Sequence, residues 1–464
     1  MNSEHGETSQ KPDDLDSDEA EGMECVVMDS DDDDNVDEMD DAAGDDDGGG
    51  IVVENKVYLP QAPLEDGEEL VCDESAYLMY HQAQTGAPCL SFDVINDNLG
   101  LNREKFPLSC YLVAGTMAQR AHTNKILVLK MSNLFKTQEK PEDEGEDDES
   151  DSDDDGNDEK KPDLDAAMIN HNGCVNRIRT TKLGDTNVAA TWSETGKVHI
   201  WDLSRPFAAL DDPTLMSSYT KNLESPEAIY TFTGHLVEGY AMAWSPTVTG
   251  RLVTGDCNKN IHMWTPKEDG KWNVDQRPYS GHTASVEDLQ WSPNEPNVMA
   301  SCSVDKSIRI WDVRAAPHQA CMLTTEEAHT RDINVIDWNK TEPFIISGGD
   351  DGVIKVWDLR QFATGKPVAT FKHHTAPITS LEWYWHDSSV FAASGSDNQL
   401  TIWDLAVERD SEVGTDDEPD IPPQLLFIHQ GQKDIKELHW HNQLPGVIIS
   451  TAYNGFNIFR TISV

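Results

Sequence analysis

Long apolar runs, paired cysteine motifs and basic residues are the features that this sequence of 464 residues lacks. No apolar run approaches the length that spans a bilayer, and the first residues are polar and acidic, so we expect neither a membrane segment nor a signal peptide. The eight cysteines include no CxxC pair and show no regular pairing, which predicts reduced thiols inside the cell. Only 35 Lys and Arg face 85 Asp and Glu, and the net charge of −50 disfavours nucleic acid and anionic membranes as partners.

Motifs of catalysis are absent as well. The sequence contains no P-loop, GxSxG, HExxH or GxGxxG, and it predicts no cofactor and no metal. Residues 151–156 resemble the opening of a calcium loop, but the twelfth position is Pro162 where such a loop has Glu. We therefore expect a protein that binds other macromolecules and is not an enzyme.

The acidic residues are concentrated in two segments. Residues 1–50 contain 21 Asp and Glu against one Lys, and residues 139–165 contain 16 against three Lys. We interpret both as disordered segments that do not bind nucleic acid directly, and that act either as solubilising tails or, as we favour, as polyanions that shield a basic partner. Ser30, Ser150 and Ser152 each have Asp three residues later, a context that acidophilic kinases prefer, and are predicted phosphorylation sites.

An internal repeat fills most of the remaining chain. Strand-like runs end in Trp-Asp at regular intervals, a histidine precedes most of these tryptophans by 28 or 29 residues, and a further Trp lies nine residues after the histidine. Alternation of apolar and polar residues, bounded by Gly, Asp, Asn and Pro, predicts short antiparallel strands within each unit. The last interval is longer because it contains an insertion, residues 406–424.

This pattern resembles the WD40 family, in which each unit is one four-stranded blade of a β-propeller. The resemblance implies a buried hydrogen-bond chain of His, Ser or Thr, Asp and Trp in each blade, and a buried carboxylate does need such donors. Since the set recurs in several blades, we expect it to be structural and not catalytic. Asn258 replaces the Asp in the blade ending at Trp264, so we expect that chain to be incomplete. The predicted members are His282, Asp305, Trp311, His329, Asp351, Trp357, His374, Asp397 and Trp403, with Ser301, Ser347 and Ser394 as hydroxyls.

Degenerate units bring the number of blades to seven. Residues 111–130 and 175–202 provide the first two, and residues 434–459 provide the last. The predicted fold class is therefore all-β, a seven-bladed propeller over residues 101–464, preceded by an acidic tail over residues 1–54.

The segment between tail and propeller, residues 55–100, is expected to contain a helix and a strand. Apolar residues at 76, 79, 80 and 83 with a following glycine predict a helix over 75–86. Residues 88–95 are the best candidate for the strand that closes the ring, because an open last blade would leave an unpaired edge.

An N-terminal helix, a closing strand and seven blades resemble the histone-binding WD proteins of the retinoblastoma-binder type. The acidic, Pro-Pro-containing insertion is similar to the insertion of that family, which forms a groove for a basic histone helix together with the N-terminal helix. The resemblance implies apolar contacts at Tyr77, Leu78 and Tyr80 and charged contacts at Asp416, Asp417, Glu418 and Asp420.

The long acidic tracts instead resemble the related glutamate-rich WD-repeat family of ribosome-assembly factors. This resemblance implies a monomeric chaperone and scaffold for a basic large-subunit ribosomal protein of the L-three type, which reaches pre-ribosomal particles through that client in the nucleus and nucleolus. Histone chaperoning stays open as an alternative. A third hypothesis is a ligase substrate receptor, because Arg314 and Arg360 fit the WDxR pattern of propellers that dock on the damaged-DNA-binding adaptor of cullin-RING ligases. Composition alone predicts only that the partner is basic.

Overall fold

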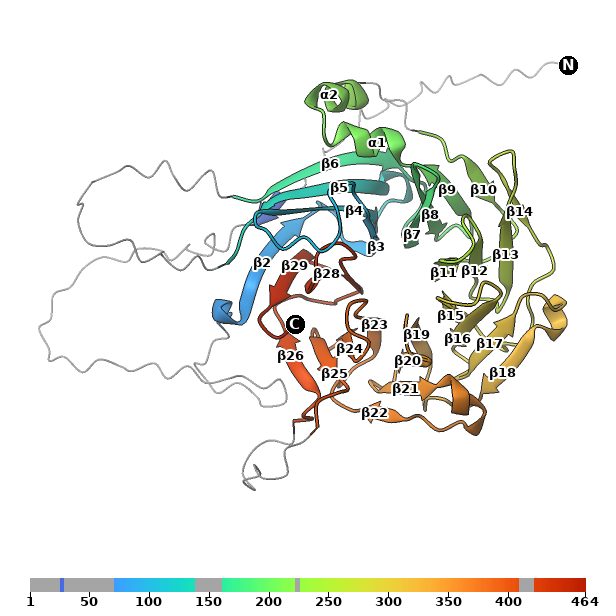
Figure 1. Ribbon diagram of the computed structural model, residues 1–464. Helices are drawn as coiled ribbons and strands as arrows, with labels where there is room; N and C mark the ends of the chain where they lie inside the picture. The colour runs from blue at the N-terminus through green and yellow to red at the C-terminus, as the bar shows by residue number, and fades with distance from the viewer. Residues whose placement is uncertain (1–25, 29–70, 138–160, 222–225, 409–420) are drawn as a thin grey trace, which may run out of the picture.

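The computed structural model describes residues 26–28, 71–137, 161–221, 226–408 and 421–464. These residues form seven antiparallel sheets arranged as blades around one axis, which confirms the predicted all-β seven-bladed propeller (Figure 1). No helix among the described residues has the length and apolar character needed to cross a membrane.

Blades 2 to 6 are each built from four consecutive strands, which run in order from the axis to the rim. They are β7 (Val175–Leu183), β8 (Thr186–Ser193), β9 (Val198–Asp202) and β10 (Tyr230–Phe232); β11 (Ala241–Trp244), β12 (Leu252–Gly255), β13 (Ile261–Pro266) and β14 (Trp272–Val274); β15 (Val286–Trp291), β16 (Val298–Ser303), β17 (Ile308–Asp312) and β18 (Cys321–Thr325); β19 (Ile333–Trp338), β20 (Phe344–Gly349), β21 (Ile354–Asp358) and β22 (Ala369–Phe371); β23 (Ile378–Trp383), β24 (Val390–Gly395), β25 (Leu400–Asp404) and β26 (Leu425–His429).

Blade 1 consists of β3 (Cys89–Ile95), β4 (Leu108–Thr116), β5 (Lys125–Leu134) and β6 (Asp163–Asn170). The segment expected to close the ring, residues 88–95, is therefore the innermost strand of blade 1, and that prediction is wrong. The predicted acidic loop over 139–165 also ends too late, because Asp163 and Asp165 belong to β6.

Blade 7 joins the two ends of the propeller. From the C-terminal part of the chain come β27 (Glu437–Trp440), β28 (Val447–Ala452) and β29 (Gly455–Thr461), and β2 (Tyr77–Gln84) pairs antiparallel with β29. The closing strand is thus β2, which satisfies the edge of β29, and the propeller begins well before the expected boundary at residue 101. A fifth strand, β1 (Val26–Met28), pairs with the outer edge of β2.

The helix expected over residues 75–86 is wrong as well. Only one 3-10 turn, η1 (Glu74–Ala76), precedes β2. Tyr77 and Tyr80 pack toward blade 6, whereas Met79 and Ala83 pack toward blade 1. A strand that is buried on both faces and interrupted by a bulge between Tyr77 and Met79 reproduces the spacing of an amphipathic helix.

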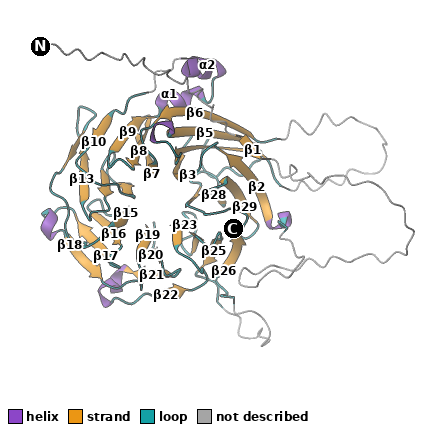
Figure 2. Cartoon of the chain, turned by 180° about the vertical axis from the view of Figure 1, so that it is seen from behind, coloured by secondary structure: helices purple, strands orange, loops and turns teal. Residues whose placement is uncertain are grey.

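Helices are few and lie outside the sheets. Between β9 and β10, α1 (Ser204–Ala209) and α2 (Pro213–Lys221) pack against blade 1 through Phe207, Met216 and Tyr219 (Figure 2). The remaining 3-10 turns are η2 (Ala121–Thr123), η5 (Pro317–Gln319) and η6 (Leu359–Thr364).

The core is divided among the blade interfaces. One apolar cluster lies between each pair of neighbouring blades, including blades 7 and 1. Trp264, Trp311, Trp357 and Trp403 are fully buried on the third strands, where a large flat side chain covers the neighbouring sheet. The ring is therefore held by continuous sheet-on-sheet packing, without a single central core.

The predicted hydrogen-bond chain is present in blades 4 and 5. In blade 4 the Trp311 indole donates to Ser301 Oγ at 2.8 Å, Ser301 contacts His282 Nε2 at 2.6 Å, and His282 Nδ1 contacts Asp305 at 2.9 Å. Blade 5 repeats this geometry with Trp357, Ser347, His329 and Asp351. Burial opposes ionisation of Asp305, but bonds from His282, Ser307 and the Thr283 N–H outweigh it and hold the pKa of Asp305 far below its usual value.

Blades 3 and 6 depart from the prediction. The chain in blade 3 is complete, because Asp256 takes the place expected of Asn258: His235 Nδ1 lies 2.8 Å from Asp256, and Trp264 donates to Thr254 at 3.0 Å. The carboxylate comes from two residues earlier in the turn, where it also accepts the backbone N–H groups of Asn258 and Asn260.

In blade 6 the hydroxyl is Thr401 and not Ser394. Trp403 donates to Thr401 Oγ1 at 2.8 Å, and His374 Nε2 lies 2.9 Å from the same oxygen. Ser394 instead contacts Thr379 at 3.0 Å. The predicted pairing of His374 with Asp397 is present at 3.0 Å.

Replacement of Asp256 by Ala is expected to lower the free energy of unfolding by about 2 kcal/mol, because it leaves the buried ring of His235 without its acceptor. Urea unfolding followed by tryptophan fluorescence measures the change. Asn258→Ala is the matched control in the same turn, and its side chain is exposed. Equal midpoints for Asp256→Ala and the wild type would show that blade 3 does not depend on this chain.

Candidate interaction site

The acidic loop of blade 1 leaves the propeller beside β2. The backbone N–H of Thr137, the last described residue before the loop, donates to the carbonyl of Leu78 at 3.2 Å. On the returning side, the amide of Asn133 donates to the carboxylate of Asp163 at the start of β6. Both ends of the loop are therefore anchored next to the strand that the N-terminal acidic segment enters.

The insertion between β25 and β26 leaves the propeller on the other side of the same strand. The side-chain amide of Gln424 donates to the carbonyl of Val407 at 2.9 Å, which holds the two ends of the insertion together. Following it, Phe427 of β26 makes an edge contact with the ring of Tyr77 at 5.4 Å between centroids. We call β2, β26, the end of β5 and the start of β6 the blade 7 margin (Figure 1).

Tyr77 and His429 connect the two strands of the margin. Burial lowers the pKa of His429 to about 3, so the ring is neutral. Asn457 Nδ2 donates to His429 Nε2 at 2.9 Å, which leaves the ring proton on Nδ1, facing the hydroxyl oxygen of Tyr77 at 2.7 Å. Tyr80 stacks on Tyr77 with 5.1 Å between ring centroids.

These contacts change the roles predicted for the three apolar residues. Tyr77 is 7% exposed and belongs to the core, and Tyr80 is half-buried. Leu78, on the opposite face at the bulge, is 38% exposed and faces outward. Of the three, Leu78 alone presents most of an apolar side chain to a partner; its role in binding stays a prediction.

The other predicted partner contacts and modification sites lie outside the described residues. They are Asp416, Asp417, Glu418 and Asp420 of the insertion, and Ser30, Ser150 and Ser152 of the acidic segments. Binding by the four acids and phosphorylation of the three serines stay predictions.

Arg314 and Arg360 are exposed at the ends of their blades. Each guanidinium forms an ion pair with the Asp two residues earlier, Arg314 with Asp312 and Arg360 with Asp358 at 2.7 Å. This is the local pairing favoured from the sequence. Docking of a ligase adaptor on these two residues stays a prediction.

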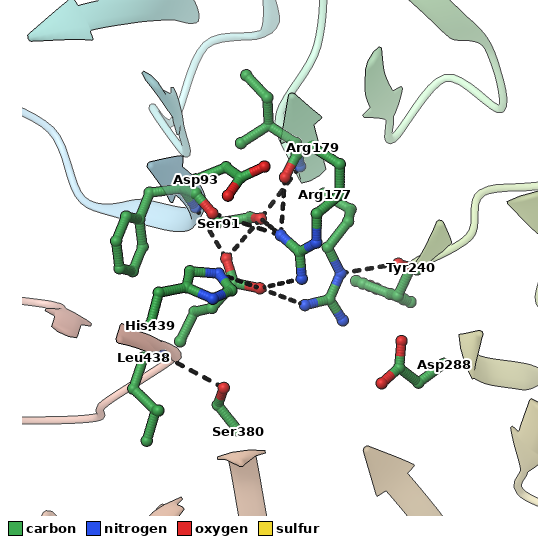
Figure 3. A network of polar contacts seen from close by, with 12 residues as sticks. Ser91, Asp93, Arg177, Arg179, Tyr240, Asp288, Ser380, Leu438 and His439 are labelled. Atoms are coloured by element: carbon green, nitrogen blue, oxygen red, sulfur yellow. Dashed lines mark hydrogen bonds and ion pairs between the residues drawn. The ribbon is translucent and has the colours of Figure 1, made fainter. Parts of the chain in front are cut away.

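Sequence reasoning missed a polar network at the axis (Figure 3). Glu437 of β27, buried with 1% of its side chain exposed, accepts from Arg177 and Arg179 of β7 at 2.6 Å each. Its second oxygen accepts from Ser91 Oγ at 2.7 Å and from the Phe92 N–H at 2.8 Å, both on β3. One carboxylate thus joins blades 7, 1 and 2 at the point where the ring closes.

Charge balance governs the ionisation of this network. Burial alone would raise the pKa of Glu437, but the guanidinium groups of Arg179 and Arg177 hold it well below its usual range. Burial would likewise lower the pKa of His439, but the carboxylates of Glu382 and Glu437 raise it to about 10. The signal available in the sequence was the placement of charged residues at positions 177, 179 and 437, where an innermost strand otherwise carries residues suited to burial.

Related acceptors recur on other innermost strands. Asp288 accepts the backbone N–H of Ile336 at 3.1 Å, and Asp337 accepts that of Trp383 at 2.8 Å, in each case from the next blade. These carboxylates satisfy backbone donors that have no strand partner toward the axis. Among the described residues, no group of three or more His, Cys, Asp and Glu side chains is placed to hold a metal ion.

Comparison with known proteins identifies the family. The family of the histone-binding protein RBBP4 and the CAF1 complex matches residues 67–134, and the WD domain, G-beta repeat, matches residues 274–312, 320–358 and 365–404. "Glutamate-rich WD repeat-containing protein 1" of Dictyostelium discoideum is 45% identical over 411 residues, which cover 86% of this chain and 83% of the relative. The chain belongs to the glutamate-rich WD-repeat family.

Two further relatives are similar over most of their length. "Protein HEAT STRESS TOLERANT DWD 1" of Arabidopsis thaliana is 47% identical over 424 residues, covering 86% of this chain and 90% of the relative. "Ribosome assembly protein rrb1" of Schizosaccharomyces pombe is 40% identical over 418 residues, covering 88% and 84%. The histone-binding match covers β2 to β5, so members of this family share with those histone binders the part of the chain that forms the blade 7 margin.

Proposed function

We propose that this protein is a non-enzymatic chaperone and assembly scaffold that binds and shields a basic ribosomal protein of the large subunit, of the L-three type, during ribosome biogenesis. The observation that carries the proposal is the convergence of acidic segments on the blade 7 margin, where the ends of residues 138–160 and 409–420 contact β2 or its neighbour β26. A rigid ring that anchors several polyanions at one place concentrates negative charge around a single client.

The relatives support the same proposal. The name of the fission yeast relative places that protein in ribosome assembly. A client of this kind is highly cationic and binds RNA indiscriminately before assembly, so a polyanion that competes with phosphates would protect it. We accordingly propose that the protein works in the nucleus and nucleolus, and that it reaches pre-ribosomal particles through its client.

Neutralising the acidic segments is expected to weaken binding of the client at least about tenfold at low salt, with the difference shrinking as salt screens the charges. The variant replaces Asp and Glu by Asn and Gln in residues 1–25, 29–50 and 139–160. It leaves Val26–Met28 of β1 and the acids of β6 intact. Pull-down of cell extract over a series of salt concentrations, with mass spectrometry of the retained proteins, measures the effect.

A shuffled variant is the matched control. It keeps the composition and charge of the same three segments in a different order, and it should retain the client because Coulomb attraction by flexible charges needs no fixed order. Equal retention by the neutralised protein and the wild type would refute the shielding role.

Histone binding is the second candidate, and the match of residues 67–134 to a family described as histone-binding favours it. The same pull-down separates the two. Retention of histones in place of ribosomal proteins at physiological salt would favour the second function.

A further inference from the structure

Blade 7 differs from the other described blades at its rim. The six other sheets end in their fourth strand, whereas β2 carries a fifth strand on its outer edge. Val26, Val27 and Met28 of β1 lie opposite Gln84, Ala83 and Gln82 in antiparallel register. A strand edge presents unpaired backbone donors and acceptors, so β2 is an edge that accepts an added strand.

The strand that fills this edge is held weakly. It contains only three residues, which is short for a strand, and the connection to β2 runs through residues 29–76, so its pairing closes a long loop. Such a strand exchanges easily with a competitor that offers a longer ladder of hydrogen bonds.

The charges around β1 disfavour the strand that is there. β1 lies between Glu24 and Asp29 in the sequence. It contacts β6, whose Asp163 and Asp165 are exposed, and exposed Asp73 and Glu74 precede β2. An acidic segment on an acidic surface is repelled, whereas a cationic strand would be attracted to the same edge.

We propose that the outer edge of β2 is a strand-addition site for an extended, cationic segment of the protein's partner, and that β1 occupies the site until that segment displaces it. The sign of the partner's charge rests on the proposed function; the site itself rests on the register of β1 and on the exposed acids around it. Backbone hydrogen bonds would supply the affinity, and the acids of β6 and η1 would select a basic strand.

A reversible lock on β1 tests the proposal in the full chain. Met28→Cys and Gln82→Cys, made together in a Cys25→Ser, Cys72→Ser background, place two thiols at directly opposite positions, within the reach of a disulfide. The probe is a ten-residue peptide of alternating Lys and Val. A second peptide with a central Val replaced by Pro is the control, because Pro interrupts the ladder while keeping the charge. Fluorescence anisotropy at low salt measures both affinities.

We expect the reduced protein to bind the Lys-Val peptide about tenfold more tightly than the proline peptide, and the oxidised protein to bind both equally weakly. The lock removes no charge, so attraction to the acidic segments alone predicts no difference between the two states. Equal affinity of the oxidised and reduced proteins for the Lys-Val peptide would overturn the strand-addition site and leave the proposed function standing. Absence of binding by either peptide in either state would overturn both. The single variants Met28→Cys and Gln82→Cys should behave like the reduced protein under both conditions.

Discussion

Replacement of Glu437 by Gln is expected to lower the free energy of unfolding by about 3–5 kcal/mol, the range for removing one partner of a buried ion pair. The loss follows from the geometry, because one carboxylate neutralises Arg177 and Arg179 and also accepts from Ser91 and Phe92. Without its charge, two guanidinium groups stay buried beside His439, whose pKa is raised and which is itself cationic at neutral pH. Urea unfolding at pH 7 measures the change.

The acid dependence of stability provides a second readout of the same residue. Because the pKa of Glu437 is well below that of a free Glu, its contribution is present above the unfolded pKa and is lost as the pH falls through the folded value. Wild-type stability should therefore fall on acidification below about pH 4.5 more steeply than that of Glu437→Gln.

Asp275→Asn is the matched control for this substitution. It removes one carboxylate from an exposed pair with Arg277 on the rim, and the unfolding midpoint should not move. An equally small effect at Glu437 would show that the network at the axis does not hold the ring closed.

Replacement of Tyr77 by Ala is expected to lower the free energy of unfolding by about 3–5 kcal/mol, as for other large buried aromatic residues. The ring packs against Tyr80, Phe427 and Phe459, and its hydroxyl satisfies buried His429. Tyr77→Phe keeps the packing and removes only that acceptor, so its expected cost is about 1–2 kcal/mol. Both values follow from urea unfolding of the full chain.

Leu78→Ser is the neighbouring control, since Leu78 faces outward and should contribute little to stability. This set separates a core role for Tyr77 from the partner contact predicted from the sequence. Weakened client binding in Tyr77→Phe at unchanged stability would instead support a direct contact of Tyr77 with the partner.

Both predictions concern residues whose roles could not be derived from local pattern. The apolar spacing of residues 76–83 fits a helix and a doubly buried, bulged strand equally well, and pairing with β29, nearly four hundred residues away, decides between them. In blade 3 the turn chemistry moved the carboxylate from position 258 to Asp256, which a fixed spacing to Trp264 could not anticipate. The side chain that joins blades 7, 1 and 2 was invisible for the same reason, because its partners are remote in the sequence.

The sequence by itself determined the repeat, the antiparallel blades, their number and the acidic character of the partner-binding segments. These properties depend on short-range spacing and on composition, which any stretch of the chain displays without reference to the rest. Only the tertiary structure decided which strand closes the ring, that Tyr77 is a core residue, and that the acidic segments meet at one margin. Those properties depend on which distant strands become neighbours when the ring closes, and closure is a property of the whole chain.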